Sequence, residues 1–287
     1  MSIAVVTDST SDISPERASR LGIAVVPLFV VFGDKSYRDN VELSRADFYH
    51  KLETEKVLPI TSQPTAAMFE AAFRPLAAAG DDILCLVISS HLSGTINAAR
   101  AAAGEIEKEF PNARIVIYDS ETVAGGLGMM ALQAQEMASR GSSVDDIVAQ
   151  LDRERATQRL YACFSDLSHL QRTGRIGKAR ALIGSLMKIV PVLALKNGEV
   201  GAEATVRTFS RAQETMLDLV MKVVTEPSKA RFLVTHTKAP ALAEAAAEKL
   251  RERLAGVEPA ALDIWEAGPV IATHGGEGAV GVFVAQG

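Results

Sequence analysis

Two hydroxyl side chains flank one glycine at Ser93, Gly94 and Thr95, where an apolar run at 83–88 gives way to a helical pattern. A strand that feeds a helix through such a turn directs free backbone N–H groups and the positive end of the helix dipole to one place. That place suits an anion, to which either hydroxyl could donate a hydrogen bond. Ser and Thr are also the preferred caps of ordinary helices, so the turn alone does not establish a site.

Two other apolar runs end in an Asp-Ser pair, at Asp8-Ser9 and at Asp119-Ser120. In an open α/β sheet, ligands bind outside the carboxyl ends of the strands, so these ends and the turn at 93–95 are predicted to share one polar rim. The rim has no evident base, metal cage or nucleophile pair, which favours binding over catalysis. The two aspartates are explained most simply as helix caps.

Among the histidines, His274 stands out because glycines at 275, 276 and 278 let another group approach it closely. A polar loop residue and a site residue are equally good interpretations of it. Ser93 and His274 together predict an alternative function, an esterase with a nucleophile and a base. The sequence around Ser93 lacks the G-x-S-x-G elbow, which disfavours that alternative. No histidine pair has close ligand spacing, so no metal site is expected.

The segment Gly276–Gly281 fits the dinucleotide pattern G-x-G-x-x-G, but a strand pattern follows it instead of a helix. Since no phosphate-binding loop of the G-x-x-x-x-G-K-[ST] kind occurs either, we expect no nucleotide site.

The 287 residues are 48% apolar, which allows a large core. The 30 basic and 35 acidic residues leave a net charge of −5, which argues against a nucleic-acid partner. Both cysteines lie in apolar runs without metal-ligand spacing, so they are predicted to be buried thiols. No apolar stretch approaches the roughly 20 residues of a membrane span, and the amino terminus has no signal-peptide pattern. These features predict a cytoplasmic protein without stable membrane insertion.

The first half of the chain alternates strand and helix patterns, which favours a parallel sheet covered by helices in three layers. Its strands are expected at 3–7, 24–32, 83–88 and 115–119, with a loop at 61–65. The second half contains a hairpin through Asn197-Gly198 and further helices, which predicts a mixed sheet. The fold class is therefore α/β, with one α/β domain at 1–158 and another at 159–287.

Five segments, in order along the chain, resemble motifs of the DegV family of bacterial fatty-acid-binding proteins. They are Val6–Asp12, Thr61–Thr65, Ser89–Thr95, Gly174–Ile176 and Thr273–Gly278. The chain departs from the family at Glu277, where a proline is usual, and at Thr173, where a glycine is usual. A carboxylate at 277 would either repel an anionic head group or favour a protonated His274 that binds it better.

The resemblance implies two α/β domains with one long-chain fatty acid in the cleft between them. Its carboxylate would lie at the domain interface and its acyl chain in the second domain. The residues implied for the carboxylate are Thr61, Ser62, Ser93, Gly94, Thr95, His274 and Gly275. The resemblance implies no catalytic residue, cofactor or metal. A separate kinase subunit with ATP would convert the bound carboxylate to an acyl phosphate, and Arg207 would dock that kinase.

Overall fold

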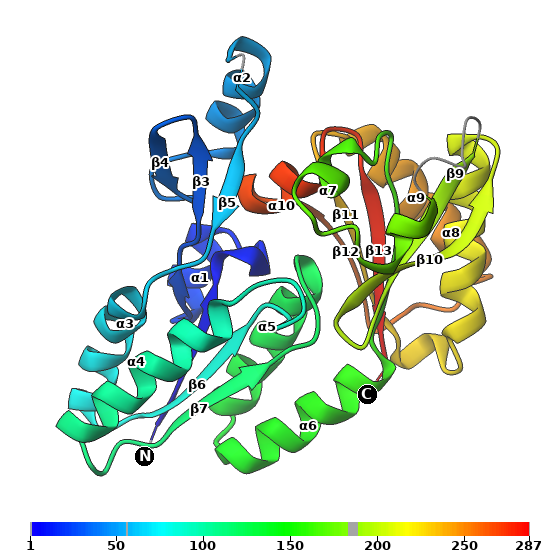
Figure 1. Ribbon diagram of the computed structural model, residues 1–287. Coiled ribbons are helices and arrows are strands. Elements are labelled where there is room, and N and C mark those ends of the chain that lie inside the picture. The colour runs from blue at the N-terminus through cyan, green and yellow to red at the C-terminus, as the bar shows by residue number, and fades with distance from the viewer. Residues whose placement is uncertain (1, 56, 183–188, 287) are drawn as a thin grey trace. The chain divides into compact units, whose positions relative to one another are not determined.

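The computed structural model describes residues 2–55, 57–182 and 189–286 (Figure 1). The chain divides into two compact units. The first contains Met1–Asp152 and Gly268–Val270, and the second contains Arg153–Ala267 and Ile271–Gly287.

The first unit contains a four-stranded sheet in the order β2-β1-β6-β7, and all its neighbouring strands are parallel. The strands are β1 (Ile3–Asp8), β2 (Ala24–Val26), β6 (Asp82–Val87) and β7 (Ile115–Asp119). The helices are α1 (Pro15–Leu21), α2 (Arg45–Thr54), α3 (Ala66–Ala79), α4 (Thr95–Glu109), α5 (Gly125–Ser139) and α6 (Val144–Thr157), of which α6 continues into the second unit. The predicted parallel α/β arrangement is confirmed.

Both faces of this sheet are covered. Ile83, Cys85 and Val87 of β6 pack in one apolar cluster with residues of α3 and α4. Leu84 and Leu86 alternate with them and are also fully buried. Successive side chains of a strand point to opposite faces, so an apolar run without polar alternation is the expected sequence of a strand buried on both sides.

The single strand expected at 24–32 is wrong. The segment forms β2 and a separate strand, β3 (Phe29–Phe32), which belongs to a small antiparallel sheet in the order β4-β3-β5. Pro27 lies at the break, and a proline has no N–H to donate to a strand ladder. The partner strands are β4 (Lys35–Arg38) and β5 (Ile60–Ser62), so the predicted loop at 61–65 begins as a strand.

The second unit contains a six-stranded mixed sheet in the order β10-β9-β8-β13-β11-β12. Only β11 and β12 are parallel neighbours. The strands are β8 (Arg159–Cys163), β9 (Val190–Lys196), β10 (Glu199–Val206), β11 (Arg231–His236), β12 (Ala261–Glu266) and β13 (Val280–Ala285). The predicted hairpin joins β9 and β10, with φ of 49° at Asn197 and 76° at Gly198, as a tight hairpin turn requires.

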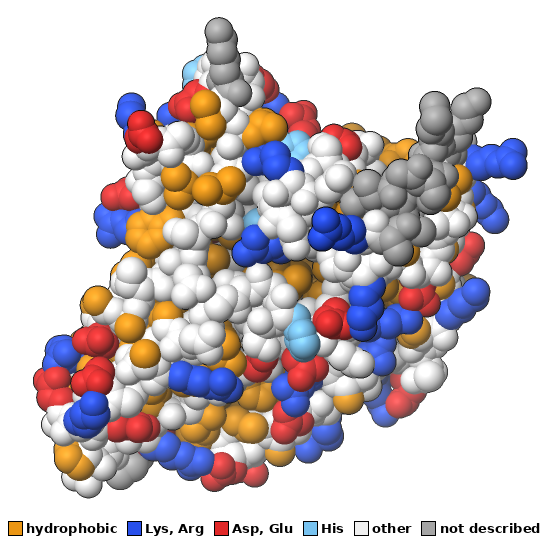
Figure 2. Space-filling view, in the orientation of Figure 1, with side chains coloured by type: hydrophobic (Ala, Val, Ile, Leu, Met, Phe, Trp, Pro, Cys, Tyr) orange, Lys and Arg blue, Asp and Glu red, His pale blue; other side chains and the backbone are white. Residues whose placement is uncertain are grey.

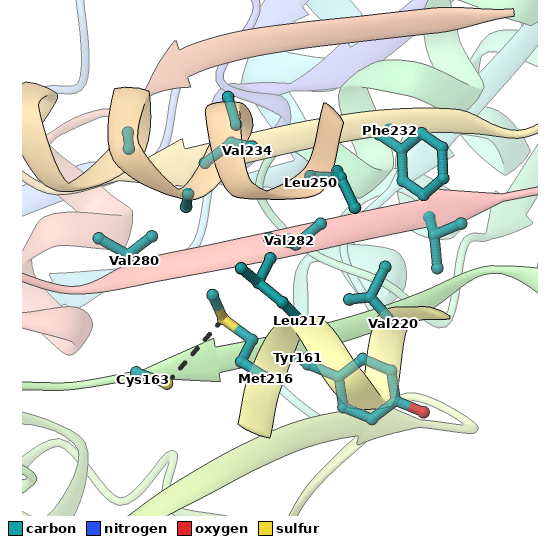
Figure 3. Close-up of a cluster of buried hydrophobic side chains, with 14 of the residues drawn as sticks. Tyr161, Cys163, Met216, Leu217, Val220, Phe232, Val234, Leu250, Val280 and Val282 are labelled. Carbon is teal, nitrogen blue, oxygen red and sulfur yellow. Dashed lines mark hydrogen bonds between the residues drawn. The ribbon is translucent and has the colours of Figure 1, made fainter. Parts of the chain in front are cut away.

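The helices of the second unit are α7 (Ser168–Arg172), α8 (Phe209–Val223), α9 (Pro240–Arg253) and α10 (Pro269–Gly275), of which α10 begins in the first unit. Side chains of α8 and α9 bury one face of the mixed sheet, as Figure 3 shows for Leu217, Leu250 and Val282. Cys163 lies in this cluster with its Sγ 3.9 Å from Sδ of Met216, and burial raises the pKa of its thiol to about 12. The prediction of buried thiols is therefore confirmed for Cys163 and for Cys85. None of the described helices is long and apolar enough to cross a membrane.

Candidate functional site

The turn before α4 concentrates hydrogen-bond donors. Ser93 Oγ lies 2.9 Å from Thr95 Oγ1, and the same Ser93 oxygen accepts a hydrogen bond from the Thr95 N–H at 3.3 Å. Thr95 is fully buried and Ser93 is half-buried. The first N–H groups of a helix have no acceptor within the helix, so the start of α4 adds amide donors and a positive dipole end to the two hydroxyls. This composition suits a carboxylate or another small anion.

The carboxylates of Asp8, which is buried, and Asp119, which is half-buried, hold this turn in place by accepting hydrogen bonds from its backbone. Asp8 accepts hydrogen bonds from the N–H groups of Thr10 at 2.9 Å and Ile88 at 2.8 Å. Asp119 accepts from the N–H of Ser90 at 3.2 Å. The two aspartates therefore fasten the ends of β1 and β7 to the segment that follows β6. Burial raises the pKa of Asp8, an effect that its hydrogen bonds oppose.

The segment that follows β5 contacts the same turn through the side chain of Gln63. A Cβ built on Gly94 would stand 3.2 Å from Cδ of Gln63 and still closer to its Oε1. The predicted residues Thr61 and Ser62 thus lie on a strand whose continuation touches the α4 turn. Because adjacent residues of a strand face opposite sides, only one of the two can face a given ligand while the strand stays regular. Thr61 is half-buried and Ser62 is exposed.

His274 and Gly275 lie at the end of α10 in the second unit, so His274 is a helix residue and not a loop residue. Gly275 is buried, and a Cβ on it would meet Thr237 Cγ2 at 3.6 Å and Phe164 Cε1 at 3.7 Å. The predicted ligand-binding residues therefore fall into two groups, one in each unit.

The imidazole of His274 is neutral across the physiological pH range. Its burial, followed by the positive charges of Arg175 and Arg172, lowers its pKa to about 3. The idea that Glu277 favours a protonated His274 is therefore wrong. The carboxylate of Glu277 instead forms an ion pair with Lys238, with Nζ and Oε2 3.4 Å apart. A neutral imidazole can donate one hydrogen bond to an anion, and the two exposed arginines supply the positive charge.

Arg172 and Arg175 belong to a local basic cluster that the sequence alone explains most simply as a solvated helix face, and less simply as a docking patch. The structure places both where their charges act on His274. No signal in the sequence pointed to this effect, because both arginines lie about 100 positions before His274.

Thr237 is a residue that sequence reasoning missed. Its hydroxyl donates to the carbonyl oxygen of Gly276 at 2.5 Å and accepts from the N–H of Ala279 at 2.9 Å. Gly276 has φ of 69°, and a Cβ on it would stand 2.8 Å from Cδ2 of His169. The glycine-rich segment after α10 therefore needs its glycines for packing, and Thr237 holds it in place.

Thr173, where the family usually has glycine, follows α7 with an ordinary φ of −85°. It is buried, and its hydroxyl donates to the carbonyl oxygen of His169 at 2.7 Å. This departure from the family pattern thus fits the helix end without strain.

Arg207 is exposed between β10 and α8, one residue before the N-cap Thr208. On the face shown in Figure 2, acidic and basic side chains lie among one another over much of the surface. In the described part of the chain, no group of three or more His, Cys, Asp or Glu side chains could hold a metal ion.

The chain is similar to known proteins in both sequence and structure. A family model described as an uncharacterised protein of the DegV family matches residues 2–287. A DegV domain-containing protein of Halalkalibacterium halodurans is 36% identical over 281 residues, which are 98% of this chain and 97% of that protein.

Two solved structures are similar over the whole of both chains. One is a DegV family protein from Thermus thermophilus, described by its fatty acid binding, with a TM-score of 0.91 and 33% identity. The other is DegV from Bacillus subtilis, described as a fatty acid binding protein, with a TM-score of 0.89 and 34% identity. The chain belongs to the DegV family.

Proposed function

We propose that this protein binds a long-chain fatty acid and presents its carboxylate to a separate ATP-dependent kinase. The observation that carries the proposal is the turn before α4, where Ser93 and Thr95 hydroxyls and helix N–H groups form a donor set. The described hydrogen bonds of these two side chains join them to each other and to backbone N–H, not to a base. Hydrogen-bond donors without a general base can bind a carboxylate, and a reaction of that carboxylate would then need another protein.

The carboxylate is proposed to be bound by Ser93, Gly94 and Thr95, with Thr61 or Ser62, and by the His274-Gly275 segment. That the two units share one ligand is part of this proposal and rests on the family resemblance. Fatty acid binding by the T. thermophilus and B. subtilis proteins supports the ligand class. A carboxylate in a dry site must be hydrogen bonded, because leaving it unpaired would cost several kcal/mol.

The acyl chain is proposed to lie against an apolar cluster of the second unit that is separate from its main core. Four of its residues are buried and three pack against them: Leu170, Ile176, Ala179 and Leu193, with Phe164, Leu167 and Val200. Phe164 connects this cluster to the site, since its ring lies 3.7 Å from the point where a Cβ on Gly275 would stand. Burial of each methylene contributes about 0.8 kcal/mol, which is enough to bind a long chain tightly.

Presentation to a kinase is proposed to use the exposed guanidinium of Arg207. Because this protein is proposed to supply neither nucleotide site nor base, a kinase partner would provide the ATP and catalyse phosphoryl transfer to the carboxylate. The protein's own part is to bind and orient the acid.

Native mass spectrometry of the purified protein tests the ligand. The expected result is a mass shift equal to one fatty acid, which is lost on delipidation and restored by adding the acid. Delipidated protein that fails to rebind any fatty acid would overturn the proposal. Hydrolysis of generic esters, abolished by Ser93→Ala, would instead support the esterase alternative.

A further inference from the structure

Two buried carboxyl groups and one half-buried arginine, which the proposed ligand site does not use, lie at the start of α10. Asp12 and Asp39 are 3% and 1% exposed, and Arg45 of α2 faces them. Asp12 Oδ1 accepts a hydrogen bond from the N–H of Gly268 at 2.8 Å. Asp39 accepts hydrogen bonds from the N–H of Val270 and from the hydroxyl of Ser9. Both carboxyl groups therefore hold the first turn of the helix that carries His274.

The two carboxyl groups lie around Gly268, which precedes α10. A Cβ built on Gly268 would stand 3.2 Å from Oδ1 of Asp12 and 3.7 Å from Oδ1 of Asp39. The second oxygen of each, Oδ2, is buried and has no hydrogen-bond partner among the described residues. An ionised carboxylate oxygen in this state is costly, and a bound proton removes that cost.

The charges around the pair do not balance if both groups are ionised. Arg45 supplies the positive charge and donates from Nη2 to the carbonyl oxygen of Asp12 at 3.4 Å. Asp8 of β1 adds a further negative charge, and α10 contributes only backbone N–H groups. One guanidinium facing two buried carboxylates leaves an excess negative charge, which one bound proton removes.

We propose that Asp12 and Asp39 hold one proton between them near neutral pH and act as a clamp on the first turn of α10, which carries His274 at its other end. The link to ligand binding rests on the proposed function. The two aspartates are positioning residues, since they contact the helix and not the ligand. Burial, as the largest influence, raises the pKa of Asp12 to about 8 and that of Asp39 to about 7, which agrees with a proton held in this range.

Loss of this proton would loosen the clamp. Above about pH 8 both carboxyl groups ionise, and their repulsion in a low-dielectric site weakens their hold on Gly268 and Val270. The first turn of α10 would then exchange its amide hydrogens more readily, and His274 would be held less firmly. Ligand affinity is expected to fall with the same pH dependence.

Amide hydrogen exchange of residues 268–275, measured by NMR on the full chain without ligand, tests the clamp directly. After correction for intrinsic exchange rates, protection at Gly268 and Val270 is expected to fall at least tenfold between about pH 6 and about pH 9. Asp12→Asn should abolish this fall, because Arg45 then balances the single remaining carboxylate of Asp39 and the asparagine Oδ1 can still accept from Gly268. The backbone tolerates this change, since Asp12 has φ of 57° and asparagine readily adopts that region. Asp39→Asn gives a second, independent variant with the same expected result.

Glu154→Gln is the matched control. Glu154 of α6 is also a fully buried carboxyl group, but it pairs with Arg231 of β11 at 2.6 Å rather than with α10. It should lower the overall stability and leave the pH profile at 268–270 unchanged. Protection that does not vary with pH in the wild type, or a profile unchanged in both asparagine variants, would overturn the clamp.

A parallel titration with a long-chain fatty acid separates this inference from the proposed function. The expected result is a wild-type affinity that falls at least tenfold over the same pH range and a nearly constant affinity in Asp12→Asn. A wild-type protein that binds no fatty acid, yet shows the exchange profile, would refute the proposed function and leave the clamp standing. Normal binding with no pH effect on affinity or exchange would refute the clamp alone.

Discussion

The amide side chain of Gln63 occupies the space that a Cβ on Gly94 would need. Gly94 is the N-cap of α4, with φ of −77° and ψ of 9°, so its backbone does not require glycine. What excludes a larger residue is the close approach of the segment after β5. This contact joins Thr61–Ser62 to Ser93–Thr95 within the first unit, and it is the basis of the first prediction.

Gly94→Ala is expected to push Gln63 away and to weaken fatty acid binding. Overpacking of this kind costs about 1–3 kcal/mol, part of which a movement of the Gln63 side chain can relieve. The control is Gly104→Ala in the same helix, because a Cβ on Gly104 meets nothing within 4 Å. The control should be neutral or stabilising by up to about 1 kcal/mol, since alanine favours helix more than glycine does. Denaturant titration and ligand binding of both variants check the prediction, and equal behaviour of the two would contradict it.

Ser93→Ala is expected to leave the fold intact and to reduce fatty acid affinity at least tenfold. A hydrogen bond to a charged group is worth about 1.5–3 kcal/mol, and each 1.4 kcal/mol is about tenfold in affinity. Loss of the hydrogen bond that Ser93 Oγ accepts from Thr95 N–H should also lower the free energy of unfolding by about 1 kcal/mol. Ser90→Ala, at an exposed position of the same turn, is the control for the titration. Unchanged affinity in Ser93→Ala would remove Ser93 from the site.

His274 makes stability depend on pH in the acid range. Its pKa is about 3 when folded and about 6.5 in the unfolded chain, so the unfolded chain binds the proton more readily. The contribution of His274 is therefore fully present above about pH 6.5 and declines by about 1.4 kcal/mol per unit as the pH falls toward 3. Comparing denaturation of the wild type with His274→Gln at several pH values isolates the contribution of His274 to the free energy of unfolding. A difference between the two that does not change with pH would show that His274 titrates normally.

Arg207→Ala is expected to separate ligand binding from use by the kinase. The variant should purify with fatty acid at wild-type occupancy and fail to support acyl phosphate formation with ATP and a cognate kinase. Arg207 is exposed, so the free energy of unfolding should change by less than about 0.5 kcal/mol. Arg251→Ala, which removes an exposed arginine from α9, should keep normal turnover. Normal turnover in Arg207→Ala would exclude its docking role, and lost occupancy would make it a ligand contact instead.

Local patterns in the sequence determined much of the fold. The alternation of strand and helix patterns predicted the parallel sheet of the first unit. The Asn197-Gly198 hairpin followed from turn chemistry alone, since both residues readily adopt positive φ. The sequence did not predict β4, β5 and α10, because segments this short show no clear hydrophobic periodicity.

The donor-rich turn at Ser93–Thr95 was also visible in the sequence, because a strand, a glycine and two hydroxyls follow one another directly. Contacts between distant segments decided the rest. Nothing in local sequence places Gln63 on Gly94 or sets Arg172 and Arg175 beside His274. The hydrogen bond from Gly268 to Asp12 joins residues 256 positions apart, so only the folded chain could show that 268–270 belongs to the first unit. Burial of Asp12 and His274, which shifts their proton affinities in opposite directions, is likewise a property of packing and not of residue order.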